Sequence, residues 1–122
     1  MTEVAIALAG GLGAVLRFVV DGLIARRRHR RVPLGTAVIN VTGSFLLGLL
    51  TSLALDHVGL SEVKSVVGTG LLGGYTTFST ASVEAVTLSM TDGPRAVTLA
   101  ATHAGGMLVI SMTAAALGLW LG

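Results

Sequence analysis

Long apolar segments alternate with short polar connectors along the 122 residues of the chain. A helix that crosses a bilayer needs about 20 predominantly apolar residues. The sequence offers four stretches of about that length, at residues 4–24, 35–55, 65–90 and 96–121. The pattern therefore predicts an all-α membrane protein in which residues 1–122 form a single unit with four transmembrane helices.

The third segment carries a sequence that disfavours a continuous helix. Gly70, Gly73 and Gly74 lie within five residues, and a run of hydroxyl side chains follows them. Each glycine weakens a helix interior, and residues 73–80 fall near the bilayer midplane when the segment is counted from Ser65. Irregular backbone at that depth requires protein or water around it. We therefore expect the third helix to be broken near the midplane, with a kinked packing helix as the alternative.

The composition supports a membrane protein and excludes several other classes. Hydrophobic residues make up 52% of the chain and charged residues only 11%, whereas soluble domains usually approach a quarter charged. This argues against a disordered chain, a basic nucleic-acid-binding module and almost any cytosolic enzyme. The chain has no cysteine, which excludes disulfides and thiolate metal sites.

Basic residues are distributed unequally between the connectors. The first and third connectors carry Arg26, Arg27, Arg28, Arg30, Arg31 and Arg95, whereas the second carries only Lys64. Connectors rich in lysine and arginine stay in the cytoplasm. We therefore expect a multi-pass protein of the plasma membrane with both termini outside. The arginine run is interpreted as this topology signal, with a lipid or regulatory site as the alternative.

Polar side chains within the apolar segments are candidates for function because their burial in a membrane is costly. Arg17 lies deep in the first segment, four residues before Asp21, and either acts in function or extends to the cytoplasmic interface. Asn40 interrupts a stripe of small residues, and its amide can donate to an anion. Glu84 suggests proton-coupled transport or, more plainly, a solvated interfacial carboxylate. His103 is expected to pack or bond to another helix.

Three stretches share the motifs of a known family. They run from Gly10 to Phe18, Gly35 to Phe45 and Gly70 to Thr80, and read GGLGAVLRF, GTAVINVTGSF and GLLGGYTTFST. In order and spacing they resemble the signatures GGxxGaxxR(F/Y), GTxxxNxxGSF and GxxGGxTTFST of the Fluc (CrcB) family of small fluoride channels. The resemblance covers the whole chain, although the fourth segment is weakly patterned.

The resemblance implies a non-enzymatic function, namely passive and selective fluoride export that lowers cytoplasmic fluoride. Its implied partners are fluoride, the lipid bilayer and a second subunit in an antiparallel dimer, with no nucleic acid. A structural sodium ion is implied at the dimer centre, held by the backbone carbonyls of Gly73 and Thr76. Arg17 matches the family's arginine and is placed at a vestibule. The implied ion pathway comprises Asn40, Phe78, Ser79, Thr80 and Glu84.

Two features favour pairing with an oppositely oriented homologue. The family pattern usually continues TTFSTF, but here the second phenylalanine is replaced by Ala81. In addition, six basic residues lie in the first and third connectors and one lies in the second. This bias should insert nearly every copy in one orientation, and copies that share an orientation cannot pair antiparallel.

Other functions remain open on the sequence alone. A small proton-coupled exporter needs a carboxylate at the centre of its first helix, where this chain has only Glu3 at the mouth and Asp21 near the far end. An intramembrane protease needs a Ser/His dyad or paired aspartates, and His103 has no motif-like serine near it. A family subunit that conducts poorly or only with a partner remains possible because of Ala81.

Overall fold

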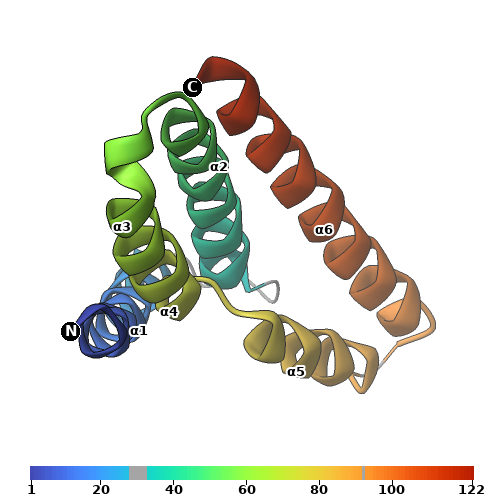
Figure 1. The fold of residues 1–122 in the computed structure, drawn as a ribbon. Helices are drawn as coiled ribbons and strands as arrows, with labels where there is room; N and C mark the ends of the chain where they lie inside the picture. The colour runs from blue at the N-terminus through green and yellow to red at the C-terminus, as the bar shows by residue number, and fades with distance from the viewer. Residues whose placement is uncertain (28–32, 92) are drawn as a thin grey trace.

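The computed structural model is helical along most of its length, with no strand in the residues it describes. It describes residues 1–27, 33–91 and 93–122. The long helices are α1 (Thr2–Arg27), α2 (Leu34–Asp56) and α6 (Ala96–Leu121) (Figure 1). Part of the expected topology signal, namely Arg28, Arg30 and Arg31, lies outside the described residues.

The stretch between α2 and α6 is divided into shorter helical pieces. In chain order these are η1 (Val58–Leu60), α3 (Ser61–Val63), η2 (Lys64–Leu72), α4 (Gly73–Tyr75) and α5 (Phe78–Ser89). η2 is a π-type helix and continues directly into α4. Between α4 and α5, Thr76 and Thr77 are extended, with φ/ψ of −76°/157° and −150°/125°. Regular helical hydrogen bonding is therefore interrupted at these two threonines.

Three of the expected spans are present as single helices in the described part of the chain. By length and composition, α1, α2 and α6 could each cross a membrane. The remaining expected span, residues 65–90, does not form one such helix because it is divided into shorter pieces. The prediction of an all-α protein is confirmed for the described residues, three of whose helices are long and apolar enough to cross a membrane, and the departure from a simple helix lies in residues 65–90.

The first part of the divided stretch, η2 and α4, runs alongside α2 in the opposite direction, and α5 then turns toward α6 (Figure 1). A Cβ atom at Gly68 would lie 3.6 Å from the side chain of Leu50, in the second half of α2. Sixteen residues later, Glu84 accepts a hydrogen bond from Thr36, near the start of α2. The stretch therefore contacts α2 on both sides of its interruption, although α5 diverges from α2.

Glycines allow the helices to pack with their backbones in contact. A Cβ atom at Gly13 of α1 would overlap the carbonyl oxygen of Leu71 in η2. A Cβ atom at Gly118 of α6 would likewise overlap the carbonyl oxygen of Phe45 in α2. Small residues at such crossings are typical of membrane helices, where close van der Waals packing drives association.

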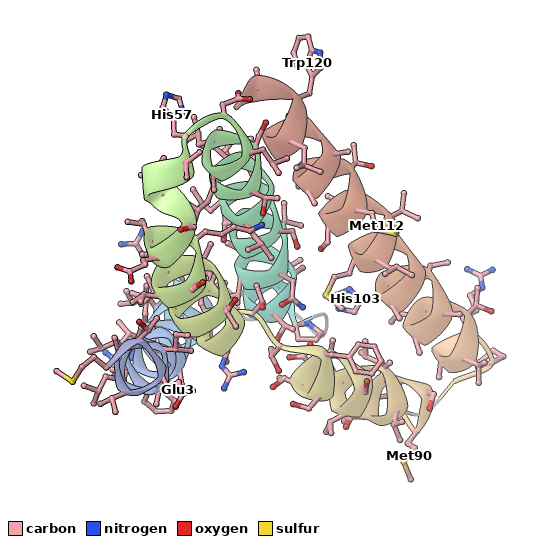
Figure 2. The ribbon with its side chains drawn as sticks, viewed as in Figure 1. Glu3, His57, Met90, His103, Met112 and Trp120 are labelled. Atoms are coloured by element: carbon pink, nitrogen blue, oxygen red, sulfur yellow. The ribbon has the colours of Figure 1, made fainter. Side chains whose placement is uncertain are left out.

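Large apolar side chains cover much of the outside of the chain. Phe18, Phe78 and Trp120 are each at least 80% exposed. Such exposure suits surroundings of lipid or of a second subunit rather than water. Trp120 and His57 lie at one end of the molecule and Met90 lies at the other (Figure 2). The α2–η1 turn and the C-terminus are therefore at the same end, as the predicted four-span topology requires.

Candidate ion-binding site at the interrupted helix

Asn40 of α2 holds the extended segment between α4 and α5. Its Nδ2 donates to the carbonyl oxygen of Thr77 at 2.9 Å, and its Oδ1 accepts from the backbone N–H of Thr77 at 2.8 Å. One side chain thus satisfies both polar groups of a residue that cannot form regular helical bonds. Buried backbone groups need such partners, so Asn40 stabilises the interruption directly.

The interruption changes the hydrogen bonding of two carbonyls. In a continuous α-helix the N–H of Thr77 would donate to Gly73, and the N–H of Thr80 would donate to Thr76. Here the Thr77 N–H donates to Asn40, and the Thr80 N–H donates to the Thr77 hydroxyl at 3.2 Å. The carbonyls of Gly73 and Thr76 therefore both lack their regular i+4 donors.

Hydroxyl groups gather at the start of α5. The Thr77 Oγ1 lies 3.2 Å from the Ser79 Oγ and 3.1 Å from the Thr80 Oγ1. The first backbone N–H groups of a helix lack partners within the helix and carry its positive dipole end. The interruption thus places carbonyls on its α4 side, which suit a cation, and N–H and hydroxyl donors on its α5 side, which suit an anion.

An open groove of about 540 Å³ lies beside the interruption, between α2, α5 and α6. Its lining includes Asn40, Thr76, Phe78, Ala81 and Ser111. The sequence-predicted Asn40, Thr76 and Phe78 therefore share one space, and the alanine that replaces the usual phenylalanine lies in it too.

The Asn40 amide has a weak contact within this groove. Besides its bond to Thr77, Nδ2 lies 3.7 Å from the Sδ of Met107. A thioether sulfur is only a weak acceptor. An anion in the groove could therefore compete for this N–H without disturbing the bonds that hold Thr77.

Arg17 lines a different space. A second pocket of about 350 Å³ lies between α1, α2 and the start of α5, and is lined by Arg17, Asp21, Thr36 and Thr80 among others. Thr77 lines both this pocket and the groove. The interruption therefore separates Arg17 and Thr80 on one side from Asn40 and Phe78 on the other.

Glu84 is half-buried rather than fully solvated. The Thr36 hydroxyl donates to its Oε1, while its Oε2 is buried with no hydrogen-bond partner in the described structure. Gly73 and Ser79 are exposed and are not among the residues lining the groove or the second pocket. The predicted pathway residues are thus divided among several surfaces of the single chain.

Three residues at this site were not identified from the sequence. Thr36 lies in the second motif but gave no sign that it would contact Glu84, 48 positions away. Met107 and Ser111 come from α6, whose apolar sequence offered no pattern to select them. Ser111 is the more notable, because it lines the groove and its Oγ is buried with no hydrogen-bond partner among the described residues.

Side-chain ligands do not form a metal site in the described part of the chain. No group of three or more His, Cys, Asp or Glu residues there could hold an ion. The oxygen atoms at the interruption are backbone carbonyls and hydroxyls, which suit hard cations better than soft ones.

Comparison with known proteins places the whole chain in one group. A family profile described as "CrcB-like protein, Camphor Resistance (CrcB)" matches residues 4–122. A protein of Leifsonia xyli subsp. xyli named "Fluoride-specific ion channel FluC 1" is 54% identical over 122 residues, covering 100% of this chain and 87% of the relative. "Fluoride-specific ion channel FluC 2" of Cutibacterium acnes is 52% identical over 123 residues, covering 100% and 98%.

Proposed function

We propose that this chain, which belongs to the CrcB family, passes fluoride through the groove beside Thr76 and Thr77. The chain is a fluoride channel subunit, and its family is one of ion channels rather than enzymes. The observation that carries the proposed path is that Asn40 lines the groove and that its Nδ2, besides its bond to the Thr77 carbonyl, contacts the weak acceptor Sδ of Met107. Fluoride efflux from liposomes, with Asn40 variants, tests it.

The pathway is proposed to replace the water around fluoride with several weak donors. In the groove, the Asn40 amide is such a donor, and the edge of the Phe78 ring carries the positive part of its quadrupole. The hydroxyls of Ser79 and Thr80 are further donors outside the groove, since Thr80 lines the second pocket and Ser79 lies at the surface. Glu84 lies further along α5, the helix that begins at Phe78. Conduction requires sites that bind an ion and release it again, and a series of neutral donors meets that need.

The divided stretch is proposed to act as the third span, broken at Thr76 and Thr77 near the midplane. Its η2 and α4 part runs antiparallel to α2, and α5 contacts the start of α2 at Thr36. The extended threonines lie opposite Asn40, well inside α2 rather than at either end. Backbone that is not helical is tolerated in a membrane where protein or a water-filled cavity surrounds it, and Asn40 and the groove provide these surroundings.

The carbonyls of Gly73 and Thr76 are proposed to hold a structural sodium ion at the dimer centre. Both lack their regular i+4 donors, and Gly73 lies at the surface, where a second subunit can approach. When bound, sodium supplies a positive charge that lowers the cost of an anion at the same depth. The chain itself contributes the oxygens and, through Asn40, keeps the Thr77 N–H away from Gly73.

Thr76→Ser should leave sodium binding unchanged, because the substitution keeps the backbone carbonyl and a hydroxyl able to bond to Leu72. Gly73→Val should abolish it, because a β-branched side chain hinders approach of the second subunit and stiffens the backbone. The measurement is thermal stability of the dimer in sodium against a large organic cation. Equal stability of the wild-type dimer in both cations would refute the site.

The functional unit is proposed to be an antiparallel dimer with an oppositely oriented homologue, in the plasma membrane and with both termini of this chain outside. The six-to-one distribution of basic residues gives one dominant orientation. Ala81 lines the groove beside Phe78, so the aromatic ring absent from this subunit is absent from the proposed pathway. A partner whose basic residues favour the opposite orientation would allow antiparallel pairing and could supply an aromatic ring to the pathway.

Expression of this chain alone, with a reporter at each terminus, should place nearly all termini outside the cell. Fluoride resistance of a sensitive host should then require co-expression with a homologue whose basic residues favour the opposite orientation. Comparable insertion in both directions, together with resistance conferred by this chain alone, would contradict the heterodimer. Resistance in neither case would favour the alternative of a non-conducting subunit, which the position of Ala81 keeps open.

A further inference from the structure

Met107 of α6 is a buried residue that lies against Asn40 at the groove. The residue is 9% exposed and lines the groove, and its Sδ lies 3.7 Å from Nδ2 of Asn40. The two helices that carry this contact also meet backbone to backbone, because a Cβ atom at Gly118 of α6 would overlap the Phe45 carbonyl oxygen of α2. The sulfur is therefore held beside the amide by the packing of α6 on α2.

The orientation of the Asn40 amide is fixed by the extended segment. Its Nδ2 donates to the Thr77 carbonyl at 2.9 Å, and its Oδ1 accepts from the Thr77 N–H at 2.8 Å. A primary amide nitrogen carries two hydrogens, and the other contact of Nδ2 is the Met107 sulfur. Because a thioether is a weak acceptor, this sulfur covers the second N–H while satisfying it poorly.

An anion bound to the second N–H cannot share this place with the sulfur. A charge-assisted hydrogen bond holds its acceptor about 2.7–2.9 Å from the nitrogen, and Sδ is only 3.7 Å from the same nitrogen. The Met107 side chain must therefore move when an anion binds there. Methionine has three rotatable bonds and adapts readily to new surroundings, and the groove of about 540 Å³ offers room for the movement.

We propose that Met107 is a displaceable cap on the fluoride donor of Asn40 and sets how strongly the groove holds the anion. The inference rests on the proposed function, because it concerns the same groove. Entry of fluoride exchanges a weak N–H···S contact for a charge-assisted hydrogen bond, and return of the sulfur gives the N–H a partner as fluoride leaves. Conduction requires a site that also releases its ion, and a weak competing acceptor lowers the affinity without closing the path.

The first test is fluoride efflux from liposomes as a function of fluoride concentration, with the co-expressed homologue present. Met107→Gln replaces the sulfur with a carbonyl oxygen of similar reach, which accepts more strongly. The concentration of half-maximal efflux should rise about fivefold, which corresponds to about 1 kcal/mol, the net contribution of a neutral hydrogen bond. The thermal stability of the variant should not fall, because the Asn40 N–H gains a partner. An unchanged half-maximal concentration would overturn the proposal.

Two further variants separate capping from packing. Met107→Leu keeps a similar volume but has no acceptor, so its half-maximal concentration should not rise. Met112→Gln makes the polar change at a methionine of α6 that is 66% exposed and is not among the residues lining the groove, so it should behave like the wild type. Equal rises in the Leu and Gln variants of Met107 would show that packing alone is affected, and would overturn the proposal.

The second test detects movement of the cap without requiring conduction. In protein labelled with ¹³C at the methionine methyl groups, the Met107 signal is identified by its absence from Met107→Leu. Fluoride should shift this signal and leave that of Met112 in place, and Asn40→Ala should abolish the shift. Fluoride flux without a shift would overturn the cap. A shift that depends on Asn40, in protein that passes no fluoride, would reject the proposed function while retaining the cap.

Discussion

Asn40→Asp should reduce fluoride efflux by about a thousandfold, because a unit negative charge about 4 Å from the anion raises its energy by about 4 kcal/mol at an effective dielectric constant of 20. The substitution also replaces the donor that bonds to the Thr77 carbonyl with an oxygen that repels it. The measurement is fluoride efflux from liposomes at matched protein load, with co-expressed partner. Flux of the Asp variant equal to that of wild type would contradict the assignment of Asn40 to the pathway.

Asn40→Ala is the control that separates loss of the donor from gain of a charge. It removes both bonds to Thr77, and should lower the free energy of unfolding by about 1–3 kcal/mol, since each such bond contributes about 0.5–1.5 kcal/mol. Its flux should fall less than that of the Asp variant. An Ala variant as inactive as the Asp variant would indicate that Asn40 acts by holding the helix interruption rather than by contacting the anion.

Gly13→Ala should destabilise the fold, because the added Cβ would overlap the Leu71 carbonyl oxygen and force the two backbones apart. Overpacking of this kind costs about 1–3 kcal/mol, and the gain of about 1 kcal/mol that alanine brings to a helix interior offsets part of it, which leaves a net loss of up to about 2 kcal/mol. Thermal unfolding of the purified protein in detergent measures the change.

Gly11→Ala is the matched control, because it makes the same change two residues away on α1, where no neighbouring atom in the described part of the chain lies within 4 Å of the added atom. Helix propensity alone should then act, and stability should stay unchanged or rise by up to about 1 kcal/mol. Equal losses in the Gly11 and Gly13 variants would mean that the contact between α1 and η2 does not hold the chain together.

The long helices could be predicted from the sequence because their apolar length alone identifies them. The glycine run indicated where the third segment becomes irregular, but the extended residues are the threonines that follow it. Thr77 is extended in contact with Asn40, 37 positions away, and hydrophobic periodicity contains no information about such a long-range bond. The motif resemblance named both residues without indicating that one side chain bonds to both backbone groups of the other.

The separation of the predicted site residues into two spaces also lay beyond the sequence. Arg17 and Thr80 line one pocket while Asn40 and Phe78 line the other, because the extended segment at Thr77 lies between them. The sequence also did not indicate which residues of α6 line the groove, because a helix with apolar residues on every face gives no reason to select Ser111. These positions follow from how the helices pack.

Fluoride efflux from liposomes that contain this chain and a co-expressed homologue of opposite charge bias tests the central claim most directly. The measurement compares fluoride with chloride, with equal pH on both sides of the membrane. We expect fluoride to leave rapidly while chloride is retained, and Asn40→Asp in this chain to abolish its share of the flux. Equal efflux of both anions, or fluoride efflux that occurs only with an imposed pH gradient, would contradict a fluoride-selective channel.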